Sequence, residues 1–290
     1  MEALQTPVAM FLFNRPEQTA RVFSRIAQVK PATLLIVADG ARSEAERSRC
    51  EAARAVIHSI DWPCDLRTHF SATNLGCKTR MSSGIDWVFE QADRAILLED
   101  DCVPDPSFFQ FCEELLGRYA DEPRVLSISG DNFQFGRSRT TDSYYFSRLT
   151  HVWGWATWRR AWAKYDLSMS RWPGVRETAF LDDLLGADAA AIDGIRHTLD
   201  RVWRGEVDTW DTQWALSSWL ADGLTVLPGV NLVTNIGFGQ DATHTRSSRS
   251  EMANLAAMEM QFPLRHPIRI ERNAEADAFT LAHLARTKSA

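Results

Sequence analysis

The sequence lacks several features that mark extracellular and membrane proteins. It has five cysteines in 290 residues, an odd number with no C-x-x-C pair, which disfavours a disulfide framework and a structural zinc site. No apolar run reaches the ~18 residues that a membrane-spanning helix needs. No basic segment precedes the short apolar run near the N-terminus. We therefore expect a reduced, cytoplasmic chain with neither signal peptide nor transmembrane segment, and leave peripheral membrane association open.

The sequence also lacks an excess of positive charge and several well-known catalytic motifs. Lys and Arg number 32 against 38 Asp and Glu, and the net charge of −6 disfavours nucleic-acid binding by bulk charge. The sequence contains no G-x-x-x-x-G-K-[ST], no G-x-G-x-x-G after its first expected strand, no G-x-S-x-G and no H-E-x-x-H. These absences argue against P-loop nucleotidases, dinucleotide-dependent oxidoreductases, α/β-hydrolases and zinc peptidases.

The first half does contain a regular alternation of apolar runs and helical periodicity. The apolar runs predict strands at 8–13, 34–40, 64–70, 94–101 and 125–130. Helical spacing of apolar residues predicts helices at 17–29, 43–60, 78–91 and 106–119. Strands that alternate with helices of this length indicate βαβ units, and therefore an α/β fold with a mostly parallel sheet.

Polar side chains follow several of these expected strands. In parallel α/β sheets, ligands bind in a crevice beyond the carboxyl ends of the strands. We therefore expect a single crevice lined by the residues at those ends, namely Asn14, Arg15, Asp39, Glu99, Asp100 and Asp101.

The second half of the chain has a different character. Nine of the 11 tryptophans lie between Trp153 and Trp219. Helices are expected at 157–165, 179–203 and 209–222, and short strands in LTVLPG and NLVTNIGFG. We divide the chain into a βαβ half (1–140), a Trp-rich half (141–246) and a charged C-terminal extension (247–290), part of which is expected to be a mobile tail or lid.

The run Glu99-Asp100-Asp101 is the strongest chemical signal in the sequence. Three adjacent acids repel one another when buried, and a hard divalent cation such as Mn²⁺ or Mg²⁺ offsets that repulsion. The alternative is a solvated strand end whose acids point at water. Because the acids end a βαβ strand and precede the turn Val103-Pro104-Asp105-Pro106, we favour a functional site.

The order of motifs along residues 7–245 resembles the GT-A glycosyltransferases. The closest likeness is to N-acetylglucosaminyltransferase I and its bacterial, family-2-like relatives. The shared motifs are F-x-x-N-R-P after the first strand, V-A-D-G at the second, N-L-G, L-L-E-D-D-C-V-P-D-P-S-F-F, Gly130-Asp131-Asn132, Trp153-Gly154-Trp155 and Trp210-Asp211-Thr212. The resemblance implies a Rossmann-like GT-A fold with a Trp-rich lobe on the acceptor side.

The resemblance also implies roles for individual residues. It implies that Asp211 is the general base. It implies that Asp101 and His244 bind Mn²⁺ or Mg²⁺. The nucleotide contacts implied are Asn14, Arg15, Asp39, Lys78 and Asp100, with Asp39 facing uracil. The sugar contacts implied are Glu99, Asp100, Gly154, Trp155 and Trp210.

The implied reaction is transfer of a sugar from a UDP-sugar to a hydroxyl of a carbohydrate, glycolipid or glycoprotein acceptor, with inversion at the anomeric carbon. Two points about the base stay open: Asp208 is a rival to Asp211, and Asp211 is also a good helix cap. Trp158, Trp162, Trp214 and Trp219 are expected in the core. The alternative functions are a non-catalytic nucleotide-sugar or carbohydrate-binding protein and, less favoured, a sugar nucleotidyltransferase. No nucleic-acid partner is expected.

Overall fold

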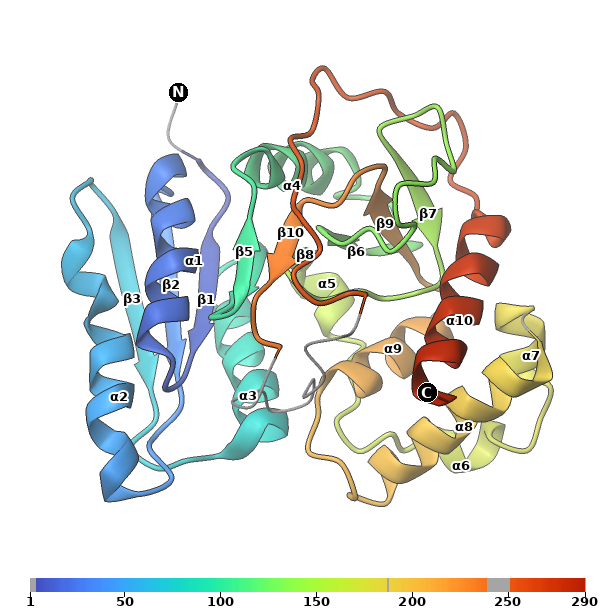
Figure 1. Cartoon of the computed structure of the whole chain (residues 1–290), viewed down its shortest axis with the longest axis horizontal. Coiled ribbons are helices and arrows are strands. Elements are labelled where there is room, and N and C mark those ends of the chain that lie inside the picture. The colour runs from blue at the N-terminus through green and yellow to red at the C-terminus, as the bar shows by residue number, and fades with distance from the viewer. Residues whose placement is uncertain (1–3, 187, 239–250, 290) are drawn as a thin grey trace.

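The computed structural model describes residues 4–186, 188–238 and 251–289 (Figure 1). Its strands are β1 (Val8–Leu12), β2 (Thr33–Ala38), β3 (Asp65–Phe70), β4 (Arg94–Glu99), β5 (Cys102–Pro104), β6 (Val125–Ser129), β7 (Tyr144–Ser147), β8 (Trp155–Trp158), β9 (Leu224–Pro228) and β10 (Val233–Asn235). Its helices are α1 (Pro16–Val29), α2 (Glu44–Arg54), the 3₁₀ turn η1 (Ala55–Ser59), α3 (Gly76–Gln91), α4 (Ser107–Arg118), α5 (Arg159–Trp162), α6 (Trp172–Val175), α7 (Phe180–Leu185), α8 (Ala189–Trp203), α9 (Asp211–Leu220) and α10 (Ala274–Ser289).

A central sheet of eight strands confirms the predicted α/β class. The strand order is β3-β2-β1-β4-β8-β6-β9-β7, and β5 pairs with β10 in a separate antiparallel ribbon. β3, β2, β1 and β4 are mutually parallel, β8 is antiparallel to both of its neighbours, and β7 is antiparallel to β9. The sheet is thus mostly parallel and is compatible with a Rossmann-like fold.

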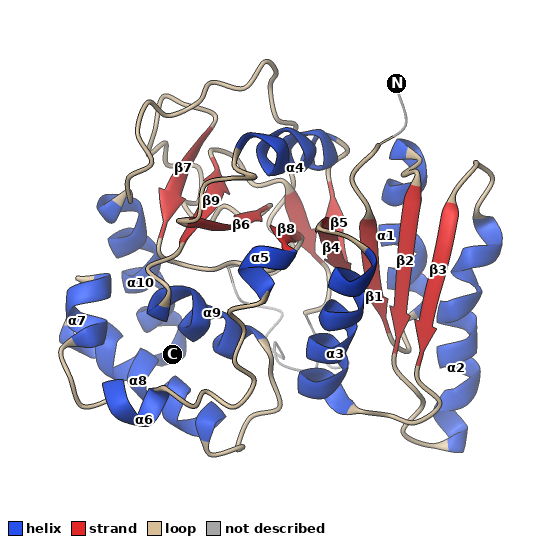
Figure 2. Ribbon diagram, turned by 180° about the vertical axis from the view of Figure 1, so that it is seen from behind, coloured by secondary structure: helices blue, strands red, loops and turns tan. Residues whose placement is uncertain are grey.

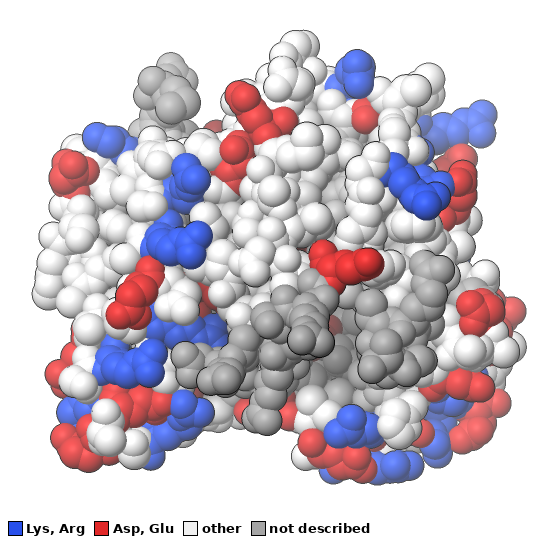
Figure 3. All heavy atoms as spheres, viewed as in Figure 1, with Lys and Arg blue, Asp and Glu red and all other residues white. Residues whose placement is uncertain are grey.

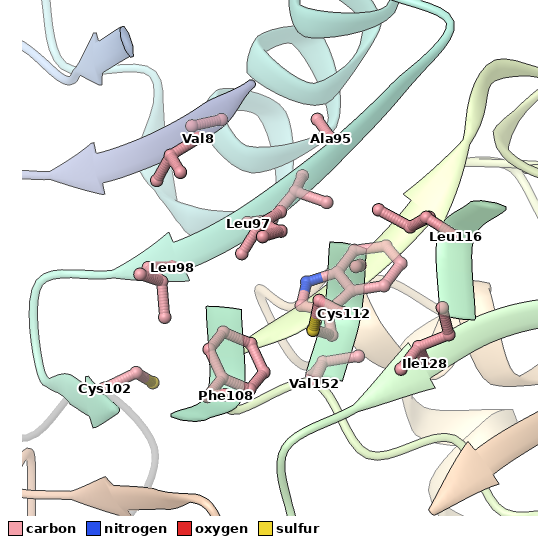
Figure 4. Close-up of a cluster of buried hydrophobic side chains, with 14 of the residues drawn as sticks. Val8, Ala95, Leu97, Leu98, Cys102, Phe108, Cys112, Leu116, Ile128 and Val152 are labelled. Carbon is pink, nitrogen blue, oxygen red and sulfur yellow. The ribbon is translucent and has the colours of Figure 1, made fainter. Parts of the chain in front are cut away.

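Helices cover both faces of the sheet, which explains why its inner strands are apolar throughout. All five residues of β1 and of β6 are buried, and so are the last five of β2. α1 and α2 cover one face of the first strands and α3 the other (Figures 1 and 2). Figure 4 shows Leu97 and Leu98 of β4 gathered with Phe108 and Cys112 of α4, which close the core beneath the acidic end of β4.

The second half differs from the sequence prediction at several elements. Residues 155–158 form β8, inserted between β4 and β6, so the helix predicted at 157–165 is reduced to the four residues of α5. The helix predicted at 179–203 is divided at Gly186, which ends α7 in a left-handed conformation with φ of 57°. β5 and β7 were not predicted, because each has only three or four residues.

The C-terminal region packs on the rest of the chain over residues 251–289. Met260 and Leu264 belong to the main core, and Leu281 of α10 joins a second core built on α7, α8 and α9. Phe146 of β7 bridges to Arg272 just before α10. That part of the C-terminal extension is a mobile tail or lid stays a prediction. In the described part of the chain, no helix is both long and apolar enough to cross a bilayer.

Candidate functional site

The carboxyl ends of β1, β2 and β4 lie side by side. The register pairs Leu12 with Ala38 and Phe11 with Glu99, and the arrowheads of β1 and β2 meet the same edge in Figure 2. A cavity of about 590 Å³ opens at this edge, a size typical of small-molecule sites. Its lining includes five of the six residues predicted for the crevice, Asn14, Arg15, Asp39, Glu99 and Asp100.

Of the three consecutive acids, Glu99 at the end of β4 and the following Asp100 line this cavity, whereas Asp101 is not part of its lining. The Asp100 carboxylate accepts a hydrogen bond from the Phe13 backbone N–H at 3.0 Å, and Arg15 Nη1 donates to Asp101 Oδ2 at 2.7 Å. Arg15 Nη1 also lies 3.6 Å from Asp100 Oδ1. Burial, followed by the Asp101 charge, raises the pKa of Asp100 to about 7. Burial and the neighbouring acids likewise raise the pKa of Glu99 well above its ordinary value.

The acidic cluster has a donor set suited to a nucleotide-bound divalent cation. Among the described residues, no group of three or more His, Cys, Asp or Glu side chains converges to hold a metal ion. However, Mg²⁺ and Mn²⁺ bound with phosphates need only one or two carboxylates, with phosphate and water oxygens completing the coordination. Asp101 fits this requirement, because Arg15 neutralises only part of the charge of three adjacent acids.

The backbone beyond β10 presses closely on Asp101. The Ile236 N–H donates to the Asp101 backbone carbonyl at 2.8 Å. A Cβ atom at position 237 would lie 1.9 Å from Asp101 Oδ2, so only glycine permits this approach. Gly237 therefore fixes where the Asp101 carboxylate can lie.

Asp39 has a different environment from the one predicted. Its carboxylate accepts hydrogen bonds from four donors, the backbone N–H groups of Gly40, Leu75 and Gly76 and the side-chain amide of Asn74, at 2.8 to 3.2 Å. Four donors use the full accepting capacity of a carboxylate. Asp39 thus holds the loop between β3 and α3 at the cavity, and its carboxylate has no lone pair left for a nucleobase.

The structure places Arg80, and not the predicted Lys78, at the cavity wall. Arg80 lines the cavity, whereas Lys78 is absent from its lining. Two residues along a helix rotate a side chain by about 200°, so Lys78 and Arg80 point in opposite directions. Arg80 is 5% exposed, donates to the His69 carbonyl at 2.6 Å, and its buried Nε has no hydrogen-bond partner among the described residues. Burial lowers its pKa.

Arg42 and Glu46, which were not predicted as site residues, also line the cavity. Glu46 of α2 accepts hydrogen bonds from the Asn14 side chain and from Arg42, which also lies over the Phe13 ring at 5.1 Å. The hydrogen bonds from Arg42 lower the pKa of Glu46 to about 2. This network joins the loop after β1 to the start of α2, and an S-x-x-E pattern at Ser43 was its one signal in the sequence.

The candidate base Asp211 is the first residue of α9, and its rival Asp208 lies in the loop just before that helix. Asp211 is exposed, and its Oδ1 accepts from Thr209 Oγ1 and from the Thr212 N–H at 2.7 Å. Its charge reaches the acidic cluster, since it is one of the groups that raise the pKa of Glu99. Asp208 lines the cavity, but both of its oxygens accept backbone N–H groups of α3 at 3.0 Å.

Two tryptophans predicted to contact sugar are in the core instead. Trp155 is 2% exposed and Trp210 is 3% exposed, and their rings stack with centroids 5.7 Å apart. A buried ring offers no face to a ligand, so both assignments are wrong. Trp158, Trp162, Trp214 and Trp219 are buried, as predicted.

Gly154 and His244 complete the predicted set. Gly154 has φ of 74° and packs under Val233, whose Cγ2 would lie 2.7 Å from an added Cβ, so the close packing here requires glycine. Its neighbour Trp153 is half-buried and makes an edge contact with Phe238. His244 lies outside the described residues.

In comparisons with known proteins, no family model and no curated protein matches the chain.

Proposed function

We propose that this chain is a metal-dependent, inverting GT-A glycosyltransferase that moves a sugar from a UDP-sugar to a hydroxyl acceptor in glycan or surface-polysaccharide synthesis. The observation that carries the proposal is the acidic run Glu99-Asp100-Asp101 at the end of β4, beside a cavity of about 590 Å³ at the carboxyl edge of the sheet. Raised pKa values for Glu99 and Asp100 indicate that the cluster lacks positive charge, which a cation with its diphosphate would bring.

The cavity offers distinct surroundings for the parts of such a donor. Its inner wall combines the apolar Phe11, Val37 and Met81 with the cationic Arg80, a lining that suits a planar base bearing a carbonyl. Arg15 lines the cavity and donates to Asp101, so the diphosphate is expected beside this pair. Asp100 and Glu99 remain for the ribose and sugar hydroxyls.

The chemistry assigned to the chain is proton removal and orientation. A cation bound at Asp101 would supply Lewis-acid stabilisation of the departing diphosphate. Asp211 would accept the proton of the acceptor hydroxyl at Oδ2, since its described hydrogen bonds are made by Oδ1. A positioned general base contributes typically 10²- to 10⁴-fold. One base acting from the face opposite the leaving group gives inversion.

The charged side chains on one face of the molecule are of mixed sign. Figure 3 shows Lys and Arg side chains alternating with Asp and Glu on the face of the molecule in that view. On that face the described charged side chains form no broad field of one sign, which favours a small-molecule substrate over a polyanion.

The test is a turnover assay. Purified protein is incubated with Mn²⁺ and a panel of UDP-hexoses and UDP-N-acetylhexosamines, and release of UDP is measured for wild type and Asp211→Asn. We expect wild type to hydrolyse at least one donor slowly, and Asp211→Asn to bind UDP normally while losing turnover. UDP binding without turnover of any donor in wild type would favour the non-catalytic nucleotide-sugar-binding function instead.

A further inference from the structure

The loop between α8 and α9 reaches across to the donor half of the molecule through Asp208. The Cys77 N–H donates to Asp208 Oδ2, and the Lys78 N–H donates to Asp208 Oδ1, each at 3.0 Å. These bonds join residues about 130 positions apart in the sequence. They connect the first turn of α3, which forms part of the cavity wall, to the segment that carries Asp211.

This contact stabilises both the N-terminus of α3 and the Asp208 carboxylate. The first N–H groups of a helix have no partner within the helix, and Leu75 at the N-cap of α3 offers no side-chain acceptor. Asp39 satisfies the Gly76 N–H, and Asp208 satisfies the next two. A carboxylate at a helix N-terminus also interacts favourably with the helix dipole. Asp208 is therefore held in place even though its residue is exposed.

The far side of the same loop is fixed to the Trp-rich half. Tyr165 Oη donates to the Trp210 carbonyl at 3.2 Å, and Gln213 Nε2 donates to the Thr209 carbonyl at 2.7 Å. The two anchored carbonyls, of Thr209 and Trp210, lie between Asp208 and Asp211, which is the first residue of α9. The Asp211 carboxylate is therefore positioned relative to the donor cavity by a short segment that is attached on both sides.

We propose that Asp208 is a positioning residue, whose bonds to the N-terminus of α3 hold the loop that leads into Asp211 at a fixed place beside the donor cavity. This inference rests on the proposed function, in which Asp211 is the base. It also assigns the two acids different roles, because both oxygens of Asp208 are already used by backbone N–H groups. Small displacements of a catalytic group cost on the order of 10²-fold in rate.

The experiment compares Asp208→Ala and Asp208→Asn with wild type and with the control Glu206→Gln. Glu206 is on the same loop but pairs with Arg201 and Arg204. For Asp208→Ala we expect kcat for UDP release, on a donor that wild type turns over, to fall by about 30-fold, with the donor KM changed by less than about threefold. Asp208→Asn, which keeps one acceptor for these N–H groups, should stay within about threefold of wild type.

Hydrogen exchange gives a second readout that needs no turnover. In Asp208→Ala, amides 77–79 and amides 209–212 should both exchange faster, because the contact holds both segments. Faster exchange at 77–79 alone, or an unchanged kcat, would mean that Asp208 only caps α3. Equal loss of kcat in the Asn and Ala variants would make Asp208 the base and overturn the positioning role. If wild type neither binds UDP with Mn²⁺ nor turns over a donor, the proposed function fails, and the exchange result still decides whether the loop is held as described.

Discussion

Neutralising Asp100 should stabilise the metal-free protein at neutral and alkaline pH. The Asp100 side chain is buried, and burial together with the adjacent Asp101 raises its pKa from 3.8 to about 7. The folded state therefore binds a proton more tightly than the unfolded state. Between about pH 4 and pH 7 the folded protein holds more protons, so its free energy of unfolding falls as the pH rises through this window and stays low above it.

The size of the effect follows from the shift. A difference of about three pKa units corresponds to about 4 kcal/mol at pH 8, taking 1.36 kcal/mol per unit. Asp100→Asn removes that penalty and keeps an oxygen for the Phe13 N–H at 3.0 Å, but it gives up the attraction to Arg15. If half of the penalty is recovered, the melting temperature should rise by about 4–8 °C at pH 8.

Thermal unfolding in EDTA at pH 5 and pH 8 measures this directly. We expect Asp100→Asn to melt higher than wild type at pH 8 and close to wild type at pH 5, and to bind UDP with Mn²⁺ more weakly. Asp61→Asn, at an exposed position before β3, is the control. An Asp100→Asn variant that is less stable than wild type at pH 8, or equally shifted at both pH values, would refute the view that the cluster is short of positive charge.

Three further predictions concern neighbouring parts of the site and the core. Gly237→Ala places a Cβ 1.9 Å from Asp101 Oδ2 and should weaken Mn²⁺-dependent UDP binding at least tenfold by calorimetry, while Gly117→Ala, which meets nothing within 4 Å, should leave it unchanged. Arg80→Met should raise the Kd for UDP about tenfold, consistent with one lost hydrogen bond from a charged group; an equal effect of Lys78→Met would contradict the assignment of Arg80 to the cavity wall. Trp155→Ala should cost about 3–5 kcal/mol in urea unfolding, because a buried ring is lost from the aromatic core, whereas Trp203→Ala, at a position 41% exposed, should cost under about 1 kcal/mol.

The sequence predicts a site residue best where that residue directly follows an expected strand. β1, β2 and β4 are short apolar runs that stop at polar residues, so their ends and the convergence of Arg15, Glu99 and Asp100 could be predicted from the alternation of strands and helices. The same alternation predicts a mostly parallel sheet, as the structure has it.

Features set by tertiary packing could not be predicted in this way. Trp155 lies in a four-residue strand whose spacing to Trp158 and Trp162 also fits a helix, and its burial depends on Trp210, which is distant in the sequence. The occupation of Asp39 by backbone N–H groups depends on how the loop before α3 folds back. Whether Lys78 or Arg80 faces the cavity depends on the rotation of α3 against the sheet.

The most direct test of the central claim is calorimetric titration of UDP into the protein with and without Mn²⁺, with GDP and CDP titrated in parallel and Asp101→Ala as the variant. The account predicts binding that requires Mn²⁺, that is strongest for UDP, and that is lost in Asp101→Ala. Binding of no diphosphate, or equal binding of UDP and Mn²⁺ by Asp101→Ala, would mean that the buried acids at the end of β4 do not form a nucleotide-sugar site.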